Sequence, residues 1–272
     1  MKNSWRLILT PPSSGSFNMA LDEALLTSTS KKSTMPALRL YSWNPPTLSL
    51  GYAQSINEVD MNTLARFGWD LVRRPTGGRA ILHTDELTYS ITAPLDDPVA
   101  QGTLLESYQR ISAALLLALS YLDIPADANK VYDVAQGNDK EPVCFEVPSN
   151  FEITVTGKKL IGSAQARKNG GVLQHGSLPL YGDLTRITQV LNYPNEQKRD
   201  AGINRLLAHA GTILSLTGKN ITLGDAQNAF IAAFAEELDL DFQQMDPSDE
   251  ENALTRELMI TKYGSKEWNH RI

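Results

Sequence analysis

The spacing of apolar residues predicts helices near the start, in the middle and towards the end of the chain. Residues 16–29 (SFNMALDEALLTST) place apolar side chains at helical spacing, with Asp22 and Glu23 on the other side. The longest apolar repeat on one helical face covers residues 103–122, and we expect this helix to lie in the core. Further helices are predicted over about 57–67, 183–192, 200–217, 222–239 and 249–263, with Thr222 as the N-cap of the fourth.

Runs typical of strands occupy most of the remaining sequence. ALRLYSW and TLSLGY alternate apolar and polar residues around Asn44, Pro45 and Pro46, a pattern typical of two strands joined by a turn. DLVRR, AILH and LTYSITA predict more strands, with RRPTGGRA as a tight turn between the first two. FEITVTG, KKLIGSAQ and VLQHGSLPLY predict a strand series broken at Gly157 and at 169–171.

This order of elements predicts an α+β fold rather than a regularly alternating one. We expect a mixed β-sheet core flanked by helices, with a helical C-terminal region from about residue 183. The chain has 272 residues, 42% of them hydrophobic, and no shift in composition divides it. A single domain over residues 1–272 is therefore expected.

Composition and charge narrow the classes of function. The formal net charge of −6 argues against a general nucleic-acid binder, because phosphate recognition normally needs a basic surface. The longest apolar run, 113–119, is too short to cross a bilayer, and residues 1–10 do not form a signal peptide. The single cysteine excludes an intrachain disulfide. We expect a cytoplasmic protein with no membrane and no nucleic-acid partner.

The common cofactor and metal motifs are missing from the sequence. No two glycines are separated by a single residue, so a dinucleotide-binding GxGxxG motif is absent. The stretch from Gly211 to Lys219 has the wrong spacing for a P-loop. The four histidines, His83, His175, His209 and His270, lack the spacing of zinc ligands. We expect neither a cofactor nor a metal.

Three stretches stand out for their chemistry: RRPTGGRAILH (73–83), PVCFEVP (142–148) and KKLIGSAQARKNGGVLQHGS (158–177). The first and third resemble the signature of the biotin/lipoate protein ligase and lipoyltransferase superfamily. The cysteine between them resembles that of octanoyltransferases of the LipM type. FNMALDEALL, RLYSWNPPTLSLGYAQ, DELTYSI and TKYGSKEWN extend the resemblance over most of the chain. It implies the mixed-sheet α+β catalytic domain of that superfamily.

Cys144 allows two interpretations. A lone cysteine in an intracellular protein is more often a small buried residue than a nucleophile. Its place after a polar loop, between Pro142 and Pro148, favours a thiol on a stiff backbone at the mouth of a site. A neighbouring cation would favour the reactive thiolate, and either lysine at 158–159 can serve. The resemblance selects Lys159 and implies that Cys144 is the nucleophile.

The resemblance also places RRPTGGRA beside an acyl pocket. Gly77 and Gly78 would let a ligand approach the backbone, and Arg73 and Arg74 would add positive charge, although a basic surface turn is the simpler interpretation. Small residues on the later strands would leave room for an acyl chain, or would mark close strand packing. The further candidates, with supporting roles for the histidines, are His83, Gly162, Ser163, Ala164 and His175.

An exposed basic patch beside this pocket would attract acidic carrier domains. Its expected members are Arg73, Arg74, Arg79, Lys158, Lys159, Arg167 and Lys168.

The resemblance implies a two-step acyl transfer in lipoate biosynthesis. Cys144 would take octanoyl from an octanoyl acyl carrier protein and pass it to the lysine of a lipoyl-domain protein such as glycine cleavage H protein. No ATP is needed, because a thioester already carries the energy for amide formation. Three alternatives stay open: an ATP-dependent lipoate-protein ligase, an amidotransferase that moves the acyl group between lipoyl domains, and a noncatalytic acyl-binding regulatory module.

Overall fold

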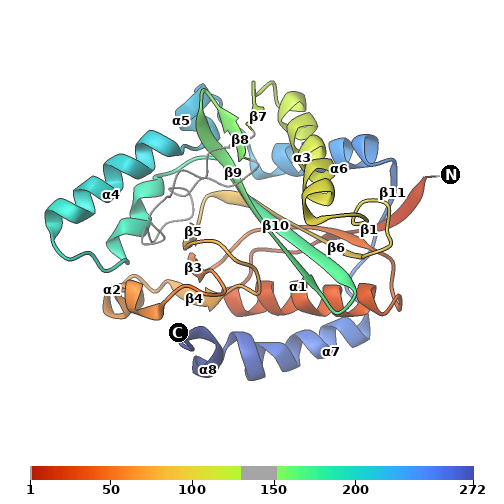
Figure 1. Ribbon diagram of the computed structural model, residues 1–272, viewed down its shortest axis with the longest axis horizontal. Coiled ribbons are helices and arrows are strands. Elements are labelled where there is room, and N and C mark those ends of the chain that lie inside the picture. Colours follow the sequence, from red (N-terminus) through yellow and green to blue (C-terminus); the bar gives the residue numbers. More distant parts are fainter. Residues whose placement is uncertain (1, 130–151) are drawn as a thin grey trace.

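The computed structural model describes residues 2–129 and 152–272, and Cys144 lies outside the described residues. Their strands form two sheets near the centre of the molecule (Figure 1). The larger sheet has the order β11-β1-β2-β6-β10-β9-β8-β7 and the smaller one the order β4-β3-β5. The strands of the larger sheet are β1 (Asn3–Leu9), β2 (Ala37–Tyr41), β6 (Glu86–Pro94), β7 (Asp127–Asn129), β8 (Glu152–Val155), β9 (Lys158–Lys168), β10 (Gly171–Pro179) and β11 (Leu240–Gln244). Those of the smaller sheet are β3 (Thr47–Leu50), β4 (Asp70–Arg73) and β5 (Ile81–His83).

Helices cover both faces of the larger sheet (Figure 1). On one face α3 (Leu104–Tyr121) packs against α6 (Leu223–Glu237), and on the other α1 (Gly15–Ser30) lies between the sheet and α7 (Asp249–Leu258). The remaining helical elements are η1 (Ile56–Glu58), α2 (Met61–Arg66), η3 (Leu184–Gln189), α4 (Glu196–His209), α5 (Ile213–Thr217), η4 (Met259–Tyr263) and α8 (Lys266–Asn269). None of the helices in the described parts of the chain combines the length and apolar character needed to span a bilayer.

The predicted α+β class and its main elements are confirmed. The helices α1, α3 and α6 match the apolar repeats, and Thr222 caps α6 by accepting a hydrogen bond from the backbone of Asp225. The two predicted strand breaks are tight turns. Both residues of each turn have positive φ, 50° and 77° at Thr156 and Gly157, and 53° and 82° at Asn169 and Gly170.

The structure also shows strand pairings and helix breaks that the sequence does not predict. The two strands predicted on either side of Asn44 to Pro46 are present, but they do not pair with each other, because β2 pairs with β1 and β6 while β3 joins the smaller sheet. Proline lacks the N–H needed to continue a ladder through this turn. The C-terminal region is not purely helical, because β11 pairs in parallel with β1. The helix expected over 200–217 is interrupted between α4 and α5, and that over 57–67 is divided into η1 and α2.

A buried ion pair attaches α7 to the sheet. Glu251 on α7 accepts hydrogen bonds of 2.8 Å from both terminal nitrogens of Arg6 on β1, and also one from Ser28 on α1. Burial raises the pKa of the Glu251 carboxyl, but the hydrogen bonds from Arg6 and Ser28 and the charge of Arg6 together lower it by more. The pKa of Glu251 therefore lies below its ordinary value of 4.5. The charged pair therefore links three elements that are far apart in the sequence.

Replacing Glu251 with Gln should destabilise the fold, because it leaves the buried Arg6 guanidinium without a counter-charge. We expect the free energy of unfolding, measured by urea titration, to fall by about 3–5 kcal/mol. Asp96→Asn is the matched control, since the Lys32–Asp96 pair is exposed, and it should leave the urea midpoint unchanged. Equal midpoints for the two variants would contradict this role of Glu251.

Candidate functional site

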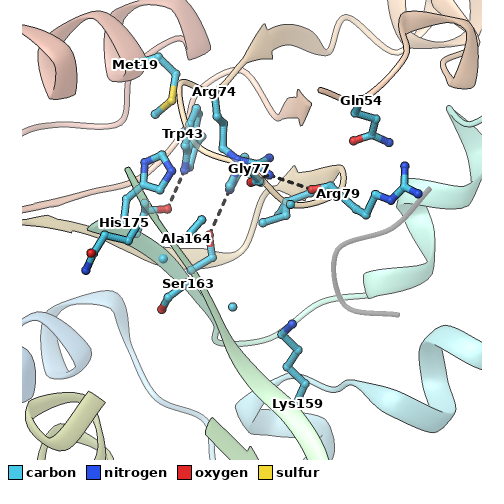
Figure 2. A pocket seen from close by; sticks show the side chains of 18 of the residues that line it. Met19, Trp43, Gln54, Arg74, Gly77, Arg79, Lys159, Ser163, Ala164 and His175 are labelled. Atoms are coloured by element: carbon cyan, nitrogen blue, oxygen red, sulfur yellow. Dashed lines mark hydrogen bonds between the residues drawn. The ribbon is translucent and has the colours of Figure 1, made fainter. Parts of the chain in front are cut away.

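A cavity of about 530 Å³ lies where the smaller sheet meets β6, β9 and β10 of the larger one (Figure 2). This volume falls within the range of small-molecule sites. Its wall is built from α1, β2, β5, β6, β9, β10 and the loops that follow β2, β3 and β4. Of the residues predicted from the sequence, those that line the cavity are Arg74, Gly77, Gly78, His83, Lys159, Gly162, Ser163, Ala164 and His175.

The central wall of the cavity is the pair of strands β9 and β10. Ala164 lies opposite His175 and Ser163 lies opposite Gly176 in this antiparallel ladder. A Cβ on Gly176 would come within 2.6 Å of the Ser163 hydroxyl and 2.7 Å of the Gly162 carbonyl. The small residues here therefore line the cavity and also allow close packing of the strands.

Lys159 and Lys158 have different surroundings although they are adjacent. The Lys159 side chain is 4% exposed, lines the cavity, and places Nζ 2.9 Å from a carboxylate oxygen of Glu152. Lys158 instead donates a hydrogen bond to the carbonyl of Leu207 on α4. Figure 2 shows Lys159 on the other side of the cavity from Trp43 and His175. Of these two adjacent lysines, therefore, only Lys159 lines the cavity.

The opposite end of the cavity rests on a buried ion pair between α1 and β2. Arg39 donates a 2.8 Å hydrogen bond to Asp22, and neither side chain is exposed. The same carboxylate accepts hydrogen bonds from Tyr41 at 2.9 Å and Ser90 at 2.7 Å. Its neighbour His175 places Nδ1 3.4 Å from the carboxylate. Asp22 thus joins α1, β2, β6 and β10 at one point.

The charges in this network shift two pKa values. Burial raises the pKa of Asp22, but Arg39, His175 and Ser90 lower it by more, so the net pKa lies below 3.8. Burial lowers the pKa of His175 below 6.5, and the opposing effect of Asp22 is smaller. We infer that His175 is neutral at neutral pH, with Nε2 2.7 Å from the Thr76 hydroxyl in the loop after β4.

A second network holds the aromatic wall. His83 has Nε2 2.7 Å from the Ser49 hydroxyl and Nδ1 2.6 Å from Glu86, so both ring nitrogens have partners. Its ring stacks on Trp43 with centroids 4.0 Å apart. Trp43 in turn donates a 2.8 Å hydrogen bond from Nε1 to Thr88. The position of His83 therefore suits it to fixing the indole that lines the cavity.

The RRPTGGRA turn is shaped by its own arginine. Arg74 donates hydrogen bonds to the carbonyls of Ser49, Gly77 and Arg79 at 2.8, 3.1 and 2.9 Å. Gly78 has a φ of 92°, and its carbonyl lies so close to Gly51 that a Cβ there would be 1.7 Å away. Four residues of this loop line the cavity: Arg74, Gly77, Gly78 and Arg79.

Arg73 does not contact the cavity. Its side chain is fully buried and donates hydrogen bonds to the carbonyls of Gly51, Gln54 and Asn269 at 2.9, 2.5 and 2.9 Å. The predicted exposed basic patch is therefore wrong for Arg73, and also for Arg74 and Lys159, which are 3% and 4% exposed. Their positive groups meet carbonyls or carboxylates inside the protein rather than solvent.

Several residues of the site escaped the sequence interpretation. Asp22 was expected on the other side of its helix, yet it is wholly buried. Asn18 and Asp22 lie four residues apart and therefore on one face of α1, a spacing that could have indicated a shared polar partner. Both accept hydrogen bonds from Arg39. Met19, Tyr41 and Trp43 also line the cavity. Within the described residues no cluster of His, Cys, Asp and Glu is arranged to hold a metal ion.

Residues 14–235 match the family of the lipoyl protein ligase A/B catalytic domain. The curated octanoyltransferase LipM of Carboxydothermus hydrogenoformans is 40% identical, and that of Bacillus subtilis 38%, with 99% of each chain covered. The bipartite lipoate protein ligase of Thermoplasma acidophilum superposes with a TM-score of 0.82 at 26% identity, covering 98% of this chain and 96% of that one. A lipoate-protein ligase A solved with ATP gives 0.80 at 26% identity, covering 98% of both.

The stability of the site should depend on pH through His175. Its pKa is lower in the folded protein than the ordinary 6.5, so below pH 6.5 the unfolded chain binds a proton that the folded one does not. The free energy of unfolding should therefore decline as the pH falls from 7.5 to about 5.5. Asp22, whose pKa is below 3.8, does not titrate in this window.

We expect His175→Gln to reduce this decline in urea titrations at several pH values. His209→Gln is the control, because His209 is exposed on α4, and it should retain the wild-type slope. An unchanged slope in His175→Gln would show that another group is responsible.

Proposed function

Because the chain belongs to the lipoyl protein ligase A/B catalytic-domain family, in its LipM octanoyltransferase group, we propose that it transfers an octanoyl group to a protein lysine in lipoate biosynthesis. The relatives named as LipM octanoyltransferases span 99% of this chain, which supports the same class of reaction over its whole length. We further propose that residues 1–272 form one catalytic domain that works in the cytoplasm, where a single cysteine stays reduced.

The observation that carries this proposal is the position of Lys159 in the cavity. A buried amine lies at one side, and the apolar surfaces of Met19 and Trp43 lie at the other. An octanoyl tail would bury its methylene groups against the apolar side, which stabilises binding by about 0.8 kcal/mol for each. The reacting carbonyl would then lie towards Lys159.

Cys144 supplies the nucleophile in this proposal, as a residue outside the described part of the chain. It precedes Glu152, the partner of Lys159, by eight positions in the sequence. Its thiolate attacks the thioester carbonyl of an octanoyl carrier protein, the new S–C bond forms, and the carrier thiol leaves. The amine of the acceptor lysine then attacks the acyl-cysteine, an amide forms, and the Cys144 thiol is released. Lys159 would favour the thiolate in the first step and assist proton removal from the acceptor in the second.

The backbone of the RRPTGGRA turn would contact the acyl donor. Gly77 and Gly78 line the cavity, and a Cβ on Gly77 would meet open space. An arm from a carrier protein could therefore approach the backbone there. The residues proposed to contact substrate are Arg74, Gly77, Gly78, His83, Gly162, Ser163, Ala164 and His175. Arg73 would support them from behind by holding the neighbouring loop.

The acceptor and the donor are part of the proposal. One structural neighbour is described with an E2 lipoyl domain, which supports a lipoyl-domain acceptor such as glycine cleavage H protein. Another neighbour was solved with ATP, which keeps an ATP-dependent lipoate-protein ligase as the second candidate. The two differ in their donor, because a ligase activates a free acid with ATP whereas a transferase uses a preformed thioester.

Incubation with octanoyl carrier protein in the absence of ATP should add one octanoyl group to the protein, as measured by intact mass. Cys144→Ser should abolish this gain, because an alcohol is a much weaker nucleophile than a thiolate. A wild-type protein that stays unmodified, but modifies a lipoyl domain when ATP and free octanoate are supplied, would establish the ligase instead.

Lys159→Ala should lower kcat for transfer to the lipoyl domain by at least about 100-fold, the size of a lost acid–base contribution. Lys158→Ala is the matched control, since Lys158 contacts the carbonyl of Leu207 and does not line the cavity. It should retain kcat within about twofold. Similar losses in both variants would remove the reason for assigning the role to Lys159.

A further inference from the structure

A group of cations and aromatic rings lies where the C-terminal residues pack against the loop after β3. We define this C-terminal basic surface as Tyr52, Lys168, Lys262, Trp268 and Arg271. The Arg271 guanidinium lies 3.7 Å from the centre of the Tyr52 ring and 4.4 Å from that of Trp268. The Lys262 ammonium lies 4.2 Å from the Trp268 ring. Tyr52 is 46% exposed, whereas Lys262, Trp268 and Arg271 are half-buried, so the surface is partly open to solvent.

The cations of this surface form one electrostatic unit. Lys168 on β9 and Lys262 on η4 both reach the carboxylate of Glu23, at 3.7 and 2.5 Å. The pKa of Tyr52 is lowered, first by Arg271 through a hydrogen bond and its charge, and to a smaller extent by Lys168 and Lys262. Glu23 neutralises part of the positive charge, while the Lys168 side chain stays 56% exposed. Positive charge is thus gathered here on a chain of net charge −6.

This surface adjoins the cavity through shared elements. Arg271 donates a 2.9 Å hydrogen bond to the carbonyl of Tyr52, and the next two residues of that loop, Ala53 and Gln54, line the cavity. Met19 also lines the cavity and belongs to the same apolar cluster as Trp268. The helix α8 contacts β4 of the smaller sheet (Figure 1). A domain seated on this surface would therefore lie next to the site.

We propose that the C-terminal basic surface docks an acidic face of the acceptor lipoyl domain. The inference rests on the proposed function. Charge complementarity selects an acidic partner and steers its approach. Arginine, tryptophan and tyrosine are also the residues most often found at the energetic centres of protein interfaces.

The acceptor fits this position better than the donor does. A lysine side chain has only a four-carbon stem, so the acceptor domain has to sit against the surface beside the cavity for its amine to enter. The rings of Tyr52 and Trp268 offer apolar contact area at this place, and Arg271 between them can pair with a carboxylate through two parallel hydrogen bonds. The surface thus combines steering charge with contact area.

The double variant Arg271→Glu, Lys168→Glu tests this surface through the Kd for an apo lipoyl domain of acidic pI, measured by calorimetry. We expect Kd to rise about tenfold at about 50 mM salt and much less at about 500 mM salt, because ions screen the repulsion. Arg271→Lys in the otherwise unchanged protein keeps the charge but loses the two parallel hydrogen bonds, so its Kd should lie between those of the wild type and the double variant. Lys198→Glu, which reverses an exposed cation on α4, is the matched control and should not change Kd. Thermal melts of all variants check that the fold is intact.

The proposal is overturned if the double variant binds the lipoyl domain as wild type does, if Lys198→Glu weakens binding equally, or if only binding of the octanoyl carrier protein is lost. It is also overturned if the wild-type protein does not bind the lipoyl domain. Salt-dependent binding through Arg271 and Lys168, without any octanoyl transfer, would support the docking surface and reject the proposed function. The experiments therefore distinguish a failure of the docking surface from a failure of the proposed octanoyl transfer.

Discussion

The buried pair of Asp22 and Arg39 is the interaction on which the site depends. Taking both charges out of water is costly, and the cost is offset only when each charge has good partners. Here the carboxylate receives hydrogen bonds from Arg39, Tyr41 and Ser90, while the guanidinium also stacks 3.8 Å from the centre of the Tyr41 ring. Through His175 and Thr76 the same network reaches the RRPTGGRA loop. One carboxylate therefore fixes a helix, three strands and a cavity loop relative to one another.

Arginines elsewhere in the chain act in the same way, as internal connectors. Arg73 bonds to carbonyls on both the loop after β3 and the C-terminal residues, and Trp268 donates a hydrogen bond back to the Arg73 carbonyl. The C-terminal segment is thus attached directly behind the cavity wall. This attachment places Arg271 and Trp268 beside the site, which is why a docking surface there can be coupled to acyl transfer without a contact to the substrate.

The sequence predicts the local features of this fold well. The capped helices and the two tight turns follow from short-range rules, because Thr222 and Gly157 act on their immediate neighbours. The resemblance predicts Lys159 and the small residues Gly162 to Ala164 of β9 as part of a site, and these residues line the cavity. Short-range rules do not predict the pairing of β1 with β11, because it joins segments more than two hundred residues apart. The burial of Asp22, Arg73 and Arg74 was also missed, since charged residues are normally exposed and only the tertiary structure supplies their partners.

In the proposed reaction, opposite ends of one cavity hold the two parts of an acyl thioester: apolar residues around Met19 and Trp43 would contact the alkyl chain, and Lys159 the reacting carbonyl. A crystal structure of the protein after acylation by an octanoyl thioester tests this assignment most directly. It should show the alkyl chain packed against Met19 and Trp43, with the carbonyl on the Lys159 side. An alkyl chain bound outside this cavity, or one that runs in the reverse direction with its methyl end at Lys159, would contradict the account.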